Sequence, residues 1–462
     1  MARRTPRPHA RRTAATGQGC RVTADGRGRA QGGRAVSGQQ WFAFVESNTT
    51  GTGREFCAAA WARGLRPVLL TRDAARYVYV EQDGVETRVL DTGDMAAVLD
   101  HCAELLRDGG LAGIASSSEY FVSTAALVAA KLGLPAADGD AIARCRDKET
   151  QRIELAAAGV PVPRFTAATE AGQAVRAAAA IGHPVVLKPV LGSGSVGVRL
   201  CRDAAETRAW AAELLGRATD ERGNPVPGRI LVEAAVQGPE FSVETFDGAV
   251  VTAVAKHIGP EPYFVETGHD VPAPVPERTA AALGDTALRA LAALGLGWGA
   301  AHTELRLTDE GPVVIEVNPR LAGGMIPVAV RAALGIDLVD AVIARAAGQP
   351  VPPARDAAGR AAVRFLHMER EGRVTDIAGL TAAREAPGVV AVGINTAVGR
   401  TVRRTNSFQD RLGSVVATGA DPQQAGARAW DATRLITIGQ TDPEERPQHE
   451  NLAGPAQGAG GR

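Results

Sequence analysis

Two neighbouring acidic segments have residue types and spacing that suit a magnesium site. Glu304 lies in one strand-like run, and Glu316 and Asn318 alternate along the next, where alternate side chains share a face. A hairpin turn at residues 308–311 would return Glu316 opposite Glu304. Two carboxylates and an amide oxygen suit Mg²⁺, which binds few protein ligands when substrate phosphates complete its shell. The alternative, acids on a solvated strand face, does not explain why they flank the apolar run 313–315.

A lysine followed by a glycine-rich loop is a candidate phosphate-binding segment. Lys188 lies near the end of the strand-like run 185–189, and residues 192–197 read Gly-Ser-Gly-Ser-Val-Gly. Glycines let backbone N–H groups approach phosphate oxygens, and lysine adds a compact point charge. A flexible turn is the common alternative, and a P-loop is excluded because no lysine precedes Ser or Thr. Only four lysines stand among the 51 basic residues, so each retained lysine is a candidate for a position that arginine's wide fork cannot fill.

The segment 264–273 combines an acid, small residues, a histidine and a proline without hydrophobic periodicity, which predicts a loop. Glu266 and His269 stand within four residues of each other there. A lone histidine is usually structural, but an acid and a histidine on one loop are also a candidate binding pair. The residues by themselves leave both interpretations open.

Composition limits the classes of protein that need to be considered. The 462 residues carry zero formal charge and are 45% hydrophobic, which predicts an ordered chain of about two to four domains. The balanced charge gives no reason to expect nucleic acid or an anionic membrane as partner. No run approaches the length of a membrane span. Five dispersed cysteines without a CxxC pair argue against a disulfide framework or a structural zinc site, and favour a reducing cytoplasm.

The elements that position these residues begin with a small parallel α/β domain reaching to about residue 140. The run 41–45 reads as a buried strand, 54–63 as a helix and 67–70 as a second strand. The segment 51–56 after the first strand resembles the start of a dinucleotide fingerprint, but it lacks the third glycine, so we expect only a tight turn.

Later segments alternate between helical and strand patterns, with glycine and proline between them. We expect helices at 140–158 and 171–180, strands at 184–189, 230–233, 240–246, 302–306 and 313–318, and a final α/β segment over 361–439. The arginine-rich residues 1–38 are typical of a disordered leader, or of a start codon assigned too far upstream, rather than of an arm that binds nucleic acid. The polar residues 441–462 predict a disordered tail.

The order of motifs along residues 41 to about 435 resembles that of the ATP-grasp superfamily. The motifs are Arg146-Asp147-Lys148, Ala158–Pro163, Val186–Pro189 with its Gly/Ser loop, Leu231–Glu233, Gly238–Glu244, Glu304 and Glu316–Arg320. The segment 264–273 further resembles the L-amino acid ligase branch, which joins amino acids into dipeptides. Residues 403–413 resemble the turn before the last strand of that family's cap domain.

The resemblance implies an α/β architecture with an α+β core. A Rossmann-like pre-ATP-grasp domain would occupy 39–140, and the ATP-grasp core 141–345 would include a hinged lid at about 164–235. A C-terminal α/β cap would occupy 346–440. ATP would lie between two antiparallel sheets.

The resemblance also implies roles for individual residues. ATP would be bound by Lys148, Lys188, Ser193, Gly194, Ser195, Glu233, Val236 and Glu240. Mg²⁺, or Mn²⁺ in its place, would be held by Glu304, Glu316 and Asn318. Glu266 would take a substrate ammonium group, and Arg320 would clamp the substrate carboxylate and its acyl phosphate. His269 would join Arg320 in stabilising negative charge at the acyl centre.

The function implied is ATP-dependent joining of an amino acid carboxylate to an amine, with release of ADP and phosphate. Secondary metabolism is the expected setting, with small-molecule substrates, a cytoplasmic location and a homodimer as the expected assembly. A biotin carboxylase-like or purine-pathway ligase is one alternative, and a non-catalytic nucleotide-binding protein is another. Lys256 receives no role, and Lys131 is expected to be structural at a helix end.

Overall fold

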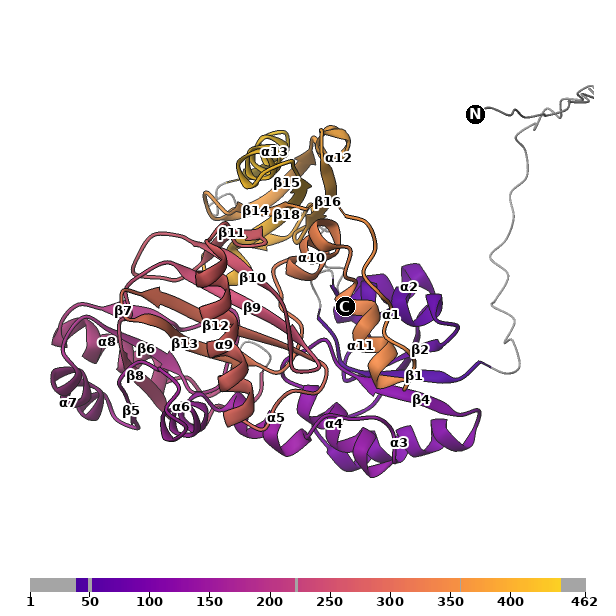
Figure 1. Ribbon diagram of the computed structural model, residues 1–462, viewed down its shortest axis with the longest axis horizontal. Coiled ribbons are helices and arrows are strands. Elements are labelled where there is room, and N and C mark those ends of the chain that lie inside the picture. The colour runs from indigo at the N-terminus through magenta and orange to yellow at the C-terminus, as the bar shows by residue number, and fades with distance from the viewer. Residues whose placement is uncertain (1–38, 49–51, 221–222, 358, 442–462) are drawn as a thin grey trace, which may run out of the picture. The chain divides into compact units, whose positions relative to one another are not determined.

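The computed structural model describes residues 39–48, 52–220, 223–357 and 359–441. The predicted leader lies outside the described residues, as does the predicted tail beyond Thr441. The described residues form helices around four β-sheets, so the mixed α/β class expected from the sequence is confirmed (Figure 1). None of their helices is both long and apolar enough to cross a membrane.

The N-terminal sheet is parallel and has the strand order β3-β2-β1-β4. Its strands β1 and β4 are buried apolar runs, as in a parallel sheet covered by helices on both faces, whereas the edge strand β3 is polar and at most partly buried. The elements are β1 (Trp41–Val45), α1 (Thr52–Ala62), β2 (Arg66–Thr71), η1 (Ala74–Arg76), α2 (Val78–Asp83), β3 (Glu86–Val89), α3 (Met95–Arg107), β4 (Leu111–Ala115) and α4 (Val122–Lys131).

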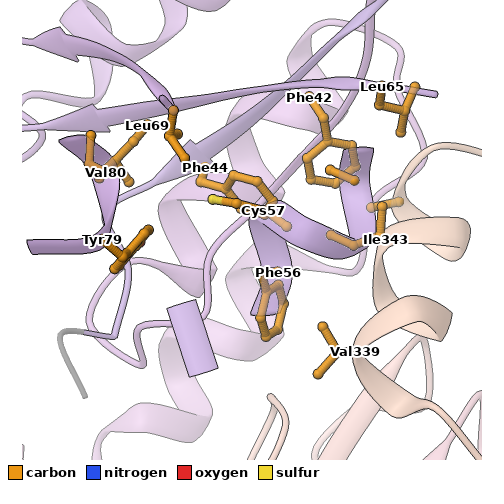
Figure 2. Packing of buried hydrophobic residues seen from close by; sticks show 14 of the residues in the cluster. Phe42, Phe44, Phe56, Cys57, Leu65, Leu69, Tyr79, Val80, Val339 and Ile343 are labelled. Atoms are coloured by element: carbon orange, nitrogen blue, oxygen red, sulfur yellow. The ribbon is translucent and has the colours of Figure 1, made fainter. Parts of the chain in front are cut away.

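One side of this sheet packs against a helix from much later in the chain. Phe42 and Phe44 of β1 share a buried cluster with Phe56 of α1. Val339 and Ile343 of α11 (Leu338–Ala346) close the same cluster (Figure 2). The N-terminal domain is therefore packed directly against a helix of the segment that follows the predicted metal-binding strands.

The second sheet is antiparallel, with the order β5-β8-β6-β7. Its elements are β5 (Phe165–Ala168), α7 (Ala171–Ile181), β6 (Val185–Pro189), β7 (Arg199–Cys201), α8 (Ala204–Leu215) and β8 (Ile230–Ala234). Two helices, α5 (Gly139–Arg146) and α6 (Lys148–Ala157), precede it where one helical stretch was expected. The break falls at Asp147, which has extended backbone and caps α6 by accepting from the N–H groups of Glu149 and Thr150.

The third sheet has eight strands in the order β13-β12-β9-β10-β11-β14-β18-β16. Its first five are β9 (Glu240–Phe246), β10 (Ala249–Ile258), β11 (Glu266–Val271), β12 (Ala300–Thr308) and β13 (Gly311–Asn318). The other three come from the C-terminal segment: β14 (Ala361–His367), β16 (Val389–Ile394) and β18 (Arg411–Thr418). Because β11 pairs with β14, the C-terminal segment extends the central sheet instead of forming a separate layer.

The remaining elements cover this sheet or follow it. They are α9 (Glu277–Ala293), α10 (Ile326–Leu334), α11, α12 (Leu380–Glu385), η2 (Phe408–Asp410), α13 (Pro422–Arg434) and a three-stranded sheet of β17 (Thr401–Val402), β15 (Gly372–Ala378) and β19 (Thr437–Thr441). The expected turn at 403–413 leads into β18. It is therefore not the turn before the last strand, because α13 and β19 follow β18.

The expectation of a loop over residues 264–273 is wrong for its central part, which forms β11. The register against β10 shifts between His257 and Ile258, so Thr267 has no register partner on β10 and forms a bulge. A bulge re-aims the side chains that flank it. Here it brings Glu266 and His269, three residues apart, to one face of the sheet. The sequence lacks a period-two pattern because this bulge interrupts the alternation and polar side chains occupy buried positions.

Candidate active site

A cleft of about 1090 Å³, counting its open mouth, lies between the antiparallel four-stranded sheet β5-β8-β6-β7 and the eight-stranded sheet. Thirteen of the fourteen predicted site residues line it: Lys148, Lys188, Ser193, Gly194, Ser195, Glu233, Val236, Glu240, Glu266, Glu304, Glu316, Asn318 and Arg320. His269, the remaining one, lies buried behind the wall with 1% of its surface exposed. Folding therefore gathers residues that are up to 172 positions apart in the chain, from Lys148 to Arg320.

Lys188 and Glu233 form a buried ion pair at one end of the cleft, with Nζ and Oε2 2.6 Å apart. Arg152 of α6 approaches the other carboxylate oxygen at 2.6 Å. Burial lowers the pKa of Lys188, although the Glu233 charge opposes this. Burial would raise the pKa of Glu233, but the two cations outweigh it and lower the pKa. Arg152 was missed from the sequence, although its position one turn after Lys148 places both on one helix face.

Lys148 connects three parts of the site from the first position of α6. Its Nζ donates to the carbonyl oxygen of Gly192 at 2.7 Å and lies 2.9 Å from Oε1 of Glu316. Burial lowers the pKa of Lys148, but the charges of Glu316 and Glu119 outweigh it, so the pKa is raised. The side chain thus stays charged between the glycine-rich loop and β13.

Arg306 positions the segment expected to contact the base and the ribose. Its Nη1 donates to the carbonyl oxygen of Val236 at 3.0 Å, and its Nη2 lies 3.0 Å from Oε2 of Glu240. The guanidinium group also lies 5.3 Å from the ring centroid of Phe264. An arginine on the strand β12 therefore fixes both predicted contacts at once, although nothing in its sequence position indicated that role.

Glu304 and Glu316 are register partners on β12 and β13, as the predicted hairpin requires. Lys256, to which no role was assigned, lies at the centre of the acids on this sheet face. Its Nζ is 2.8 Å from Glu304, 2.7 Å from Glu266 and 3.0 Å from Glu240. Burial acts to lower the pKa of Lys256, but these three charges raise it well above its usual value. The only sequence signal for this residue was the scarcity of lysine.

His302 holds Glu304 from the other side. Its Nδ1 lies 2.7 Å from Glu244 and its Nε2 lies 3.1 Å from Glu304. Burial disfavours the charged imidazole, but the two carboxylates outweigh burial and raise the pKa of His302 to about 9. Glu304 is therefore oriented by its neighbours before any ligand binds.

The donor set of Glu304, Glu316 and Asn318 fits a hard divalent cation. The described residues contain no group of three or more His, Cys, Asp or Glu side chains that could hold a metal by themselves. Two carboxylates with one amide oxygen would be completed by nucleotide phosphates, as Mg²⁺ prefers. Each carboxylate already faces an ammonium group, from Lys256 or Lys148, so the positions favour positive charge.

Arg320 forms a buried ion pair with Glu119, which follows β4 in the N-terminal domain. Its Nη1 also donates to the carbonyl oxygen of Leu321 at 2.9 Å. Burial would raise the pKa of Glu119, but Arg320 and Lys148 outweigh it and lower the pKa. This acid was missed from the sequence because it stands 201 residues before its partner. It connects the N-terminal domain to the reacting end of the cleft.

Glu266 also pairs with Arg411 of β18, whose guanidinium lies 4.3 Å from the ring centroid of Phe365. Next to this pair, neither ring nitrogen of His269 has a hydrogen-bond partner among the described residues. Burial lowers the pKa of His269 to about 3, although the Glu266 charge opposes this. His269 is therefore a neutral imidazole at physiological pH, with one N–H to donate and no charge to contribute.

The C-terminal segment touches the glycine-rich loop. The backbone N–H of Phe408 donates to the carbonyl oxygen of Gly194 at 3.1 Å. Gly194 has φ +64°, and a Cβ there would lie 2.3 Å from Cδ1 of Phe408. On the other side of the loop, Oγ of Ser195 donates to the carbonyl oxygen of Phe264 at 3.0 Å. The loop is thus held closed over the cleft from two sides.

Comparison with known families adds to this geometry. A model of the ATP-grasp domain matches residues 181–328, and a model of the L-amino acid ligase C-terminal domain 2 matches residues 364–439. The chain belongs to the ATP-grasp superfamily. It is a ligase of the class that forms C–N bonds. Enzymes of this superfamily use ATP together with divalent metal ions.

Individual relatives are consistent with that assignment. The ATP-grasp chain resembles the crystal structure of an L-amino acid ligase from Bacillus licheniformis with a TM-score of 0.71 and 21% identity, over 88% of this chain and 100% of the other. This likeness confirms the predicted ATP-grasp fold. The chain is 38% identical to the uncharacterized protein y4rH of Sinorhizobium fredii, over 80% of this chain and 77% of that protein. It is 33% identical to carnosine synthase 1 of Gallus gallus, of which it spans only 29%.

Proposed function

We propose that this ATP-grasp ligase joins the carboxylate of one amino acid to the amine of a second amino acid or a related amine. ATP and Mg²⁺ drive the reaction, and ADP and phosphate are released. The observation that carries the proposal is the lining of one cleft. It holds Lys148 and Lys188 for phosphates, Glu304 and Glu316 for a cation, and Glu266 for an ammonium group.

The first step activates a poor electrophile. A carboxylate oxygen of the first substrate attacks the γ-phosphorus, the bond from that phosphorus to the β–γ bridging oxygen breaks, and ADP leaves. The product is an acyl phosphate. Lys148 and Lys188 neutralise phosphate charge, and the protein contributes chiefly by positioning the reactants. A Mg²⁺ ion held by Glu304, Glu316 and Asn318 would supply further charge neutralisation there, and Mn²⁺ suits the same oxygen ligands.

The second step forms the amide bond. The amine nitrogen attacks the acyl carbon, the bond from that carbon to the phosphate oxygen breaks, phosphate leaves and one proton is lost from the nitrogen. Arg320 offsets the charge that develops on the acyl oxygen. His269 acts as a neutral N–H donor to the same centre rather than as a cation. Glu266, paired with Lys256 and Arg411 without ligand, receives the ammonium group of the first substrate.

The nucleotide occupies the other end of the cleft. Ser193, Gly194 and Ser195 cover its phosphates, so the closed loop excludes water that would hydrolyse the acyl phosphate. Glu233 and Val236 lie at the strand that reads the adenine base, and Glu240 accepts from the ribose hydroxyls. Arg306 keeps Val236 and Glu240 in place.

The proposal also includes the organisation of the chain and its setting. We assign 39–140 to the pre-ATP-grasp domain, 141–345 to the core with a lid at about 164–235, and 346–440 to the cap. A secondary-metabolite pathway, a homodimer and a cytoplasmic location complete it. The free, buried thiols of all four described cysteines support a reducing compartment.

A substrate screen tests the proposal. The enzyme is mixed with ATP, Mg²⁺ and pools of amino acids, and phosphate release and new peptide masses are measured. Amino-acid-dependent ADP and phosphate with a matching dipeptide mass is the expected result. Release of AMP and pyrophosphate contradicts the mechanism. Stimulation by bicarbonate with biotin instead of amino acids indicates a carboxylase, and nucleotide binding without turnover on any pool indicates a non-catalytic protein.

A further inference from the structure

A second cavity of about 820 Å³, counting its mouth, lies between the N-terminal domain and the core. Its wall is mostly apolar and includes Val122, Ala126 and Ala129 of α4. Val342 and Ala346 of α11 line it from the opposite side, and both also contact the buried N-terminal cluster to which Val339 and Ile343 of the same helix belong (Figure 2). The packing that joins the two domains therefore also builds this cavity.

The two cavities meet at Arg320, which lines both. Asn318 precedes it on the cleft side, and Pro319, Leu321 and Ala322 face the second cavity. The chain that leaves β13 is thus the wall between them.

Charge distinguishes the two cavities. The cleft is lined by charges of both signs: six glutamates, Glu233, Glu240, Glu261, Glu266, Glu304 and Glu316, and five basic residues, Lys148, Lys188, Lys256, Arg306 and Arg320. The described lining of the second cavity contains two arginines, Arg320 and Arg345, and no carboxylate. The cleft therefore suits ammonium and metal-bound phosphate groups, whereas the second cavity suits an organic anion with an apolar body.

We propose that the second cavity binds the amino acid that supplies the amine, and that it selects one with a large apolar side chain and a free carboxylate. This inference rests on the proposed ligase function and deepens it by naming the class of the second substrate. The side chain would lie against α4, the carboxylate against Arg345, and the amine would point past Arg320 toward the acyl phosphate.

Arg345 is suited to bind that carboxylate. It pairs with Asp247 at 3.1 Å, with both side chains more than a third exposed, so solvent screens the pair and a substrate carboxylate can replace it. Its guanidinium lies 4.9 Å from the ring centroid of Trp298, another residue of the lining. Contact with the Trp298 ring restricts the orientation of the Arg345 guanidinium group, and this favours bidentate binding of a carboxylate.

Arg320 assists the amine in a different way. An ammonium group is not a nucleophile, and a nearby guanidinium disfavours the protonated form of an amine. Because Glu119 pairs with Arg320 and offsets its charge, the effect on an amine that approaches the acyl carbon is the reduced one of an ion pair. The first substrate keeps its own ammonium group at Glu266, where acids favour the charged form, so the wrong amine is not activated.

Filling the cavity is the first test. Ala126→Leu adds bulk toward the lining, and Ala130→Leu on the exposed side of the same helix is the matched control. With leucine and glycine compared as amine donors, Ala126→Leu should raise the KM for leucine about tenfold and leave those for glycine and ATP unchanged. The control should leave all three unchanged. Val122→Ala, which enlarges the cavity, should not raise the KM for leucine and keeps the test valid if Ala126→Leu fails to fold.

Removing the charge is the second test. Arg345→Met keeps the apolar stem, and it should raise the KM for leucine about tenfold while that for leucinamide stays the same. Asp247→Asn, which removes the partner but keeps the arginine, should not raise the KM for leucine. Equal effects on leucine and leucinamide contradict a carboxylate site at Arg345.

The outcomes separate the inference from the function on which it rests. Fragmentation of the product by mass spectrometry shows which amino acid supplied the amine. A folded Ala126→Leu enzyme with an unchanged KM for leucine, or with a raised KM only for the activated substrate, overturns the inference and leaves the ligase function standing. An unaltered enzyme that makes no amide from any pool overturns the ligase function itself.

Discussion

Glu304 and Glu316 face each other across β12 and β13, yet each forms its ion pair with a different lysine. Lys256 approaches Glu304 from within the same sheet, and Lys148 approaches Glu316 from α6. Both acids are therefore held in place by ion pairs before a nucleotide arrives. Binding of a metal–nucleotide complex would replace interactions between these groups rather than assemble the site from separate parts.

Removal of either acid should therefore abolish metal-dependent turnover. We expect Glu316→Ala to lower kcat/KM by about 100-fold or more, because charge stabilisation of the phosphates is lost. Calorimetric titration with ADP should lose its dependence on Mg²⁺. Glu310→Ala, on the exposed turn of the same hairpin, is the control and should behave like the unaltered enzyme. Full activity of Glu316→Ala would show that the metal site is wrong.

Lys188 should not be replaceable by arginine. Its side chain is 5% exposed and shares the Glu233 carboxylate with Arg152, so the wide guanidinium group of an arginine does not fit there without moving one of them. We expect Lys188→Arg to weaken ADP binding about tenfold or more. The exposed Lys131→Arg is the matched control and should bind ADP normally. Equal affinity of both variants would contradict the role inferred for Lys188.

His269 should make the protein sensitive to acid. Burial lowers its pKa to about 3, despite the opposing charge of Glu266, whereas its unfolded value is about 6.5. Between these values the unfolded chain binds the extra proton, so stability falls as the pH drops from 6.5 toward 3, by on the order of 1 kcal/mol per pH unit. Urea unfolding at several pH values should therefore show a smaller loss for His269→Asn. Arg411, Lys256 and His302 also act on this imidazole, so they must be left intact. An unchanged slope would mean that His269 is not held neutral.

Gly194 should link the lid loop to the cap. A Cβ at this position would lie 2.3 Å from the Phe408 ring, and its φ of +64° is strained for other residues. We expect Gly194→Ala to raise the KM for ATP about tenfold, because the loop is displaced from the phosphates. Phe408→Ala in the same chain should restore part of the loss by making room. A double variant no better than Gly194→Ala would show that the contact with the cap is not what positions the loop.

Much of the site could be predicted because local patterns constrain it strongly. Strand alternation and a short hairpin were enough to place Glu304 opposite Glu316, since both depend on neighbours within 15 residues. Lysine scarcity drew attention to Lys188 and Lys256, but it assigned no role to the second. The β11 segment was misjudged because one bulged residue interrupts its alternation, and pairing with β14 over 90 residues away stabilises it as a strand.

The sequence alone therefore indicated the superfamily, most of the helices and strands, and the acids that local spacing places on one strand face. Only the tertiary structure decided which charges meet. Glu119 reaches Arg320, Arg411 reaches Glu266, and Lys256 joins three acids from separate strands. The second cavity belongs to the same category, because α4 (Val122–Lys131) and α11 (Leu338–Ala346), far apart in the chain, build it together. The physical reason is that burial and Coulomb attraction act through space, and the spacing of residues along the chain does not record which ones folding brings together.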